Sequence, residues 1–176
     1  MKKFIFGAFS LVGFATVNAQ NTVTLNVRLK PIQTLLVATA QKTVNLDYNT
    51  RDDYANGVSS NNADHLTIYS TGGFQVKVKS AGSTLNLVNG TKTIQASSIQ
   101  IKASAGTDPV NGAQYSAIAP LSATDITLVT STAGGVDKKI SVEYKGGAAN
   151  AYLDNYVAGQ NPAVYTTELT YSIIPQ

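Results

Sequence analysis

The 176-residue chain has no cysteine, no tryptophan, one methionine and one histidine, and only 13% of its residues are charged. Without cysteine it can form neither a disulfide nor a cysteine nucleophile, and one histidine makes it a poor candidate for zinc, which usually recruits several His or Cys ligands. The low charge and a hydrophobic content of 43% exclude a disordered chain and a coiled coil. What remains is a weakly charged globular domain.

The chain also lacks a basic cluster in its main part. Its net charge is +3, but two of the basic residues, Lys2 and Lys3, stand at the very start. No later segment gathers Lys and Arg in the way that neutralising a phosphate backbone requires. We therefore do not expect nucleic acid as a partner.

Residues 1–19 have the pattern of a secretory signal peptide. Lys2 and Lys3 precede an apolar run at 4–17, and the small residues of Val17-Asn18-Ala19 predict cleavage before Gln20. The apolar run is about 14 residues, short of the roughly 20 that a spanning helix needs. We expect an exported protein without a membrane span.

Alternation of apolar and polar residues is the dominant pattern after the leader, and it predicts strands with one buried face. It recurs in short runs at 44–48, 66–68, 74–78, 85–87, 99–101, 126–128 and 140–144. Turn residues separate the runs at 72–73, 89–90, 134–135 and 146–147. Many short strands at this spacing predict an all-β, immunoglobulin-like antiparallel β-sandwich over residues 32–176.

Three polar stretches, at 49–64, 104–124 and 146–162, are too long for hairpin turns and are expected as loops. The last of them also fits a short helix that Asn150 would cap and Gly159 would end.

Both ends of the mature chain carry a strict alternation. In the first strand, residues 22–29, the apolar positions are Val23, Leu25, Val27 and Leu29. In the last strand the corresponding positions are Tyr165, Thr167, Leu169, Tyr171 and Ile173. Chain ends fray unless something ties them down, so each strand needs a partner in the same molecule or in another.

The opening Val-x-Leu-x-Val-x-Leu pattern with the apolar run at 32–37, together with the closing stretch at 164–173, resembles archaic chaperone-usher pilins of the spore coat U type. The stretch at 53–58 is similar to small secreted β proteins of Bacteroidetes, mostly uncharacterised. The pilin resemblance implies a sandwich that lacks one strand and a donor-strand extension at 20–31 that fills the groove of the next subunit. The last strand would then form an edge of that groove.

The same resemblance implies the partners and the role. The partners would be copies of the chain in a homopolymer, a periplasmic chaperone and an outer-membrane usher. The product would be a fimbria at the cell surface, or an extracellular fibre, that serves adhesion. We expect no enzyme activity and no cofactor.

A second hypothesis stays open. The first strand can instead pair with the last strand of its own molecule, which gives a monomeric secreted binding module for glycan or cell-wall material. Tyr54, Tyr115, Tyr152 and Tyr156 fall in predicted loops, where aromatic rings can stack on sugars. Pro31 fits both hypotheses, as a hinge or as a corner between sheets.

Residues for catalysis or metal binding are sparse. His65, the one histidine, is expected on an outward face, and no Gly-x-Ser-x-Gly motif accompanies it, so we assign no catalytic residue. A calcium loop is an alternative at Asp47, Asp52, Asp53 and Asp64, but their spacing does not match the calcium-loop pattern. We assign no metal.

Overall fold

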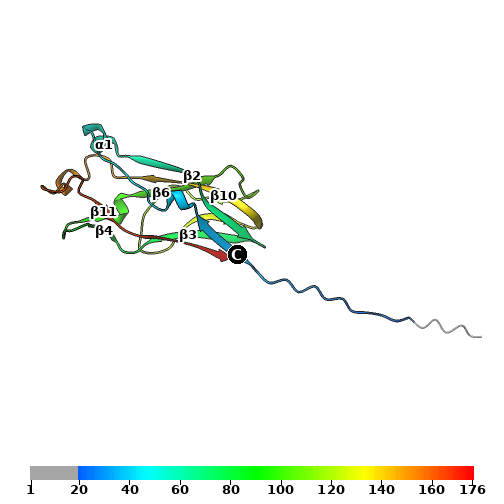
Figure 1. Cartoon of the computed structure of the whole chain (residues 1–176). Helices are drawn as coiled ribbons and strands as arrows, with labels where there is room; N and C mark the ends of the chain where they lie inside the picture. The colour runs from blue at the N-terminus through cyan, green and yellow to red at the C-terminus, as the bar shows by residue number, and fades with distance from the viewer. Residues whose placement is uncertain (1–19) are drawn as a thin grey trace, which may run out of the picture.

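The computed structural model describes residues 20–176, so the predicted leader at 1–19 lies outside the described residues. Residues 33–175 form the strands of an antiparallel sandwich, and residues 20–32 run away from one end of it without secondary structure (Figure 1). No helix in the described part of the chain is long and apolar enough to cross a bilayer.

Two larger sheets and one small sheet build the sandwich (Figure 1). The five-stranded sheet has the order β1 (Gln33–Val37), β2 (Ser59–Ser70), β10 (Gly135–Lys145), β6 (Gln100–Ala105) and β8 (Ala119–Pro120). The four-stranded sheet has the order β12 (Leu169–Pro175), β3 (Phe74–Ser80), β9 (Ile126–Ser131) and β7 (Gln114–Tyr115). The small sheet has the order β11 (Tyr165–Thr166), β4 (Thr84–Leu87) and β5 (Thr93–Gln95).

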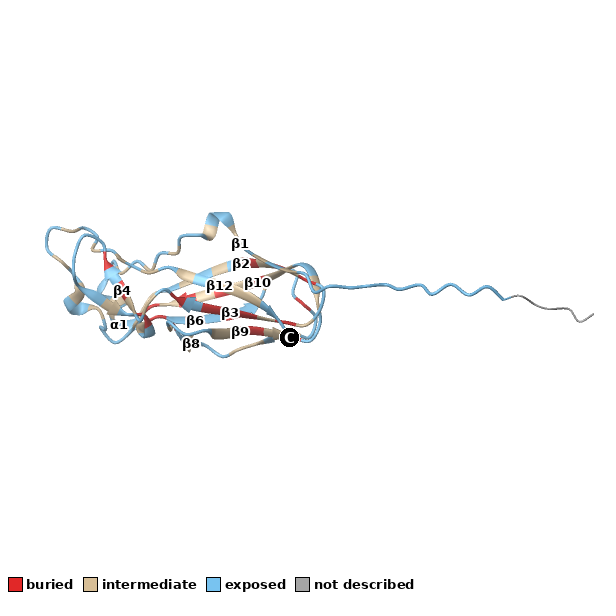
Figure 2. Ribbon diagram, turned by 90° about the horizontal axis from the view of Figure 1, so that it is seen from below, coloured by how far each residue is buried: buried red, intermediate tan, exposed pale blue. Residues whose placement is uncertain are grey.

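The core lies between the sheets, where the predicted alternation places the apolar side chains (Figure 2). In β3, Phe74, Val76 and Val78 are fully buried, and the residues between them are more exposed. The five-stranded sheet contributes buried side chains to the same cluster, among them Leu66, Ile68, Ile101, Ile140 and Val142. The prediction of an all-β sandwich is therefore confirmed, and the turns at 72–73, 89–90 and 134–135 join consecutive strands.

The stretch at 49–64 is not a loop as predicted. It holds the helix α1 (Arg51–Asn56) and the first part of β2. The Thr50 hydroxyl accepts a hydrogen bond from the Asp53 N–H at 3.2 Å, and the Asp53 carboxylate accepts one from the Thr50 N–H at 2.7 Å. This reciprocal cap starts the helix. Gly57 ends it with φ of 78°, where a Cβ would meet the Gly146 carbonyl oxygen at 2.8 Å.

The other two long stretches hold little regular structure. The strands β7 and β8, two residues each, lie within 104–124. The helix that Asn150 was expected to cap is only the 3-10 turn η3 (Leu153–Asn155), which follows Tyr152. Two further 3-10 turns are η1 (Thr39–Gln41) and η2 (Ala96–Ser98). Such short turns give no helical periodicity that a sequence pattern could reveal.

Core packing can be tested with two leucines in different environments. Leu128 is fully buried in β9, whereas Leu36 in β1 is 64% exposed. We expect Leu128→Ala to lower the free energy of unfolding by about 2–5 kcal/mol, because it removes buried methyl groups and leaves a cavity. The control Leu36→Ala should change it by about 0.5 kcal/mol or less. Urea unfolding of both variants measures the difference, and equal effects would contradict this assignment of the core.

Candidate functional site

The strands β1 and β12 lie beside each other at the edges of the two large sheets without pairing. Their Cα atoms approach within 8 Å. In the described chain β1 is hydrogen-bonded only to β2, and β12 only to β3. We call this boundary the seam: β1 and residues 42–49 form one side, and β12 forms the other. Unpaired edges of this kind can accept a further strand.

Residues 42–49 continue the β1 side of the seam. The run at 44–48 within it was predicted as a strand, but within the described residues no backbone–backbone hydrogen bond joins the segment to other segments. Val44 and Leu46 nevertheless pack against the core. The segment therefore has the buried apolar face of a strand, but its backbone is not hydrogen-bonded to a neighbouring strand.

Apolar side chains line both sides of the seam and are only partly buried. Leu35 and Val37 come from β1, and Leu169, Tyr171 and Ile173 come from β12; all five touch the core cluster. A closing strand would cover the exposed part of these side chains.

The predicted last strand is in fact two strands. Tyr165 belongs to β11 and lies opposite Leu87 of β4, while Leu169, Tyr171 and Ile173 belong to β12. Thr167 lies between the two strands. The chain thus changes partner sheet between Thr166 and Leu169, so only the β12 part of the predicted edge flanks the seam.

The four apolar residues of the first strand do not reach the seam of their own chain. Val23, Leu25, Val27 and Leu29 are 91%, 86%, 77% and 88% exposed. Residues 20–32 form no strand, and β12, the strand that the second hypothesis pairs with them, pairs with β3 instead. The structure therefore leaves the apolar face of the extension uncovered.

A series of hydrogen-bonded polar side chains, with His65 and Tyr144 buried and Gln41 and Tyr171 partly buried, runs between the two large sheets. The Tyr171 hydroxyl of β12 contacts the Tyr144 hydroxyl of β10, which lies 3.0 Å from His65 Nε2. His65 Nδ1 lies 2.9 Å from Gln41 Oε1, and the Gln41 amide donates to the Ala63 carbonyl at 3.0 Å. Because Gln41 Oε1 can only accept, Nδ1 carries the proton and Nε2 accepts from Tyr144. These contacts link the two sheets by a directed series of hydrogen bonds.

The expected outward position of His65 was wrong, because the residue is 2% exposed. In the pairing of β2 with β10, Leu66 lies opposite Ile140 but Asn62 lies opposite Val142, so a bulge occupies residues 63–65. Asp64 within it has φ of 52°. The bulge shifts the alternation and turns two consecutive residues, His65 and Leu66, inward.

Burial governs the pKa values along this series. It lowers the pKa of His65 below its usual value and raises the pKa of Tyr144 to about 12. It also raises the pKa of Tyr171, which the neighbouring Tyr144 raises further. All three groups are therefore neutral at pH 7, as the series of hydrogen bonds requires.

Two of the four aspartates of the calcium alternative, Asp53 and Asp64, have separate structural roles. Asp53 caps α1, and hydrogen bonds from the Thr50 and Asn49 backbone lower its pKa. Asp64 accepts from the Thr107 hydroxyl at 2.6 Å and the Thr107 N–H at 2.8 Å, and these bonds lower its pKa. Within residues 20–176 no three His, Asp or Glu side chains come together as a metal-binding group.

The four loop tyrosines are not gathered in one place. Tyr54 and Tyr152 pack edge to face on Tyr48, with ring centroids 5.3 and 5.1 Å from it. Tyr115 lies on β7 with a buried hydroxyl that has no partner in the described chain, and Tyr156 is exposed. Tyr48, the last residue of the alternating run at 44–48, is partly buried outside any strand, and its burial beside Tyr152 raises its pKa to about 12.

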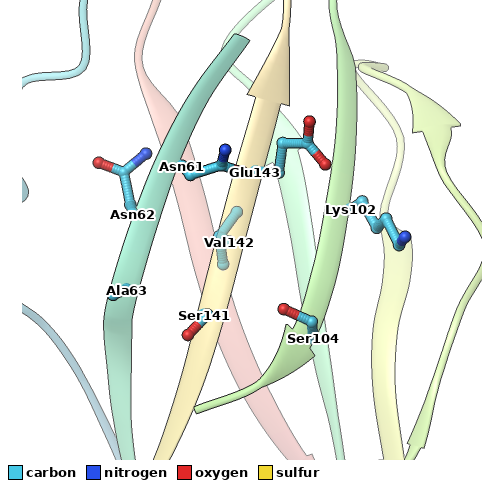
Figure 3. A pocket seen from close by; sticks show the side chains of 8 residues that line it. All are labelled: Asn61, Asn62, Ala63, Lys102, Ser104, Ser141, Val142 and Glu143. Carbon is cyan, nitrogen blue, oxygen red and sulfur yellow. The ribbon is translucent and has the colours of Figure 1, made fainter. Parts of the chain in front are cut away.

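A shallow polar pocket of about 250 Å³ lies on the outer face of the five-stranded sheet (Figure 3). Asn61 and Asn62 come from β2, Ser141 and Glu143 from β10, and Lys102 and Ser104 from β6. Sequence reasoning missed this site because alternating polar residues on a strand normally indicate only a solvated face.

No known family model matches the chain, and no curated protein matches it.

The buried histidine predicts a dependence of stability on pH. Because the pKa of His65 is lower in the folded state, the unfolded state takes up a proton first as the pH falls below about 6.5. We expect the free energy of unfolding to fall between pH 7 and pH 5 by no more than about 1.4 kcal/mol per pH unit. Asp53 and Asp64, whose folded pKa values are lowered, contribute only at lower pH.

The matched variant is His65→Gln, which removes the titrating group from the one position that holds a histidine. Urea unfolding at a series of pH values should give a flat profile over this window for the variant, whatever its stability at pH 7. The same slope in both proteins would contradict the assignment to His65.

Proposed function

We propose that this chain is a structural subunit that polymerises by donor-strand exchange into a surface fibre, and that the fibre serves adhesion. Residues 23–29 of one copy occupy the seam of the next. The observation that carries the proposal is that one chain holds both an extension with four exposed apolar side chains and a sandwich in which two edge strands, β1 and β12, each leave one backbone edge unpaired.

The two segments are of equal length, and both alternate apolar with polar residues. Residues 23–29 match the seven residues of β12, and each segment spans about 23 Å when extended. The apolar residues of the extension alternate with polar ones, as the inward residues Leu169, Tyr171 and Ile173 alternate along β12. A paired strand could therefore direct its whole apolar face into the core while its backbone bonds to the unpaired edge.

The burial available is large for such a short segment. Full burial of Val23, Leu25, Val27 and Leu29 is worth about 1.5–3 kcal/mol for each side chain, or about 6–12 kcal/mol together before the costs of association and ordering. That range is comparable with the stability of a whole domain. Such a contact dissociates slowly, which suits a fibre under mechanical load.

The proposal also implies that the exported chain needs protection before assembly. An exported copy with an open seam exposes both an unpaired edge and an apolar extension, which are aggregation hazards. A periplasmic chaperone that covers the seam, and an outer-membrane usher that exchanges it for the extension of the next copy, would meet this need.

Matched substitutions on the two faces of the extension test strand exchange. Leu25→Asp and Val27→Asp each place a charge on the apolar face, whereas the controls Thr24→Asp and Asn26→Asp place it on the polar face. In detergent without heating, the parent chain and both controls should run as a ladder of multimers that collapses on boiling. The apolar-face variants should run as monomers, because a buried unpaired charge opposes insertion.

A single monomer band for the unheated parent chain would reject polymerisation and favour the monomeric module. Equal ladders from all four variants would show that the multimers are held by some other contact.

The shallow polar pocket favours a second candidate function, binding of glycan or cell-wall material. Six of its eight lining residues, from three strands, carry amide, hydroxyl or charged side chains, which are groups that bond to sugar hydroxyls (Figure 3). If this candidate is right, Asn61→Ala combined with Glu143→Ala should reduce retention of the chain on insoluble cell-wall polysaccharide. The control Lys79→Ala, on β3 of the other sheet, should bind like the parent.

A further inference from the structure

Three asparagines of the chain, Asn56, Asn89 and Asn111, are followed directly by glycine. An asparagine side chain can react with the backbone nitrogen of the next residue, and glycine favours this reaction because it has no Cβ to shield that nitrogen and leaves the backbone free to rotate. All three asparagines are exposed to solvent. Exposure therefore does not distinguish them, but the backbone around each of them differs.

The reaction needs only the chain and water. The glycine nitrogen forms a bond to Cγ of the asparagine, and Nδ2 leaves as ammonia with the proton of the glycine N–H. Water then opens the resulting succinimide ring at one of its two carbonyl carbons, which yields aspartate or isoaspartate. The reaction requires a glycine N–H that no acceptor holds and a peptide group between the two residues that can rotate.

Asn56, at the end of α1, does not meet the first requirement. The N–H of the following residue, Gly57, donates to the Asp53 carbonyl at 2.8 Å. Gly57 also packs closely on the backbone of Gly146, because a Cβ on Gly57 would meet the Gly146 carbonyl oxygen at 2.8 Å. Ring closure at Asn56 would break the hydrogen bond that ends the helix and move a packed backbone.

Asn89, in the turn between β4 and β5, does not meet the second requirement. Its carbonyl accepts a hydrogen bond from the Gln160 side-chain amide at 3.2 Å. The following residue, Gly90, packs against the buried side chain of Leu87, which a Cβ on Gly90 would overlap. The peptide group between Asn89 and Gly90 is therefore held at both residues, and its rotation would disturb a core side chain.

Asn111, in the turn between β6 and β7, meets both requirements. Within residues 20–176 no acceptor binds the N–H of the following residue, Gly112. Gly112 has φ of 74°, and no atom lies within 4 Å of the position of a Cβ on it. Two hydrogen bonds hold the turn: the Ala113 N–H donates to the Val110 carbonyl at 3.2 Å, and the exposed Gln114 amide donates to the Gly112 carbonyl at 3.3 Å. Neither bond involves the reacting nitrogen.

We propose that Asn111 is a self-modification site, which converts to aspartate and isoaspartate in the folded protein while the fold protects Asn56 and Asn89. Both products add a negative charge to the turn. Isoaspartate also adds one backbone atom between Val110, which is buried, and Ala113, which packs against the core. The edge strand β7 begins at the next residue. This inference is independent of the proposed strand exchange.

Peptide mass spectrometry tests the selectivity. The purified chain is incubated at mildly alkaline pH, folded in one sample and unfolded in guanidinium chloride in the other, and conversion at each asparagine is followed over time. In the folded chain we expect Asn56 and Asn89 to react about tenfold more slowly than Asn111, or slower still, because they must first open locally at a cost of about 1.4 kcal/mol or more. In denaturant the three should react at similar rates.

Equal rates at the three sites of the folded chain would overturn the proposal. So would a preference for Asn111 that persists in denaturant, because the local sequence and not the fold would then select the site. Aspartate without isoaspartate at Asn111 would overturn the ring mechanism. As a second measurement, Asn111→Gln should abolish the slow appearance of an acidic form in ion-exchange separation of the intact folded chain, and the control Asn89→Gln should retain it. An acidic form that persists in Asn111→Gln would also overturn the proposal.

Discussion

An unpaired row of backbone N–H and C=O groups along β12 is the constraint on which the rest of the structure depends. A sheet edge needs a partner or a cover, and here β1 approaches β12 without bonding to it. The partly buried side chains along the seam, the free backbone of residues 42–49 and the uncovered extension are all groups that a further strand could cover.

The series of polar side chains between the two large sheets gives the sandwich a fixed inner geometry despite its open edge. Tyr171 of β12 is linked through the buried neutral groups of Tyr144 and His65 to Gln41 of η1, the turn that follows β1. A buried series with every member satisfied specifies one arrangement of the two sheets, because any shift leaves a polar group without a partner.

The sequence predicts the sandwich well where alternation is regular and poorly where one residue interrupts it. Phe74, Val76 and Val78 follow the period of a strand and are buried as expected. The predicted outward position of His65 was wrong because the bulge at 63–65 depends on how β2 pairs with β10. The amino-acid pattern around His65 does not indicate that pairing. The helix α1 has a readable cap at Thr50 and Asp53, but six residues are too few to show helical periodicity.

Some parts of the candidate site could likewise be predicted from the sequence, and others could not. The apolar face of the extension and the inward residues of β12 can be read from the sequence, because both are strictly alternating. The change of partner between Tyr165 and Leu169, and the pocket around Asn61 and Glu143, arise from strands that are distant in the sequence. Contacts of that range are not encoded in short segments.

The shared exit of both chain ends has a practical consequence for handling the protein. The Gln176 N–H is bonded to the Gly73 carbonyl at 3.0 Å, next to the point where the extension departs. A fluorescent protein or affinity tag fused after Gln176 would crowd this exit. The exposed turn at Asn111 and Gly112, remote in sequence from both termini, is the better place to attach a label.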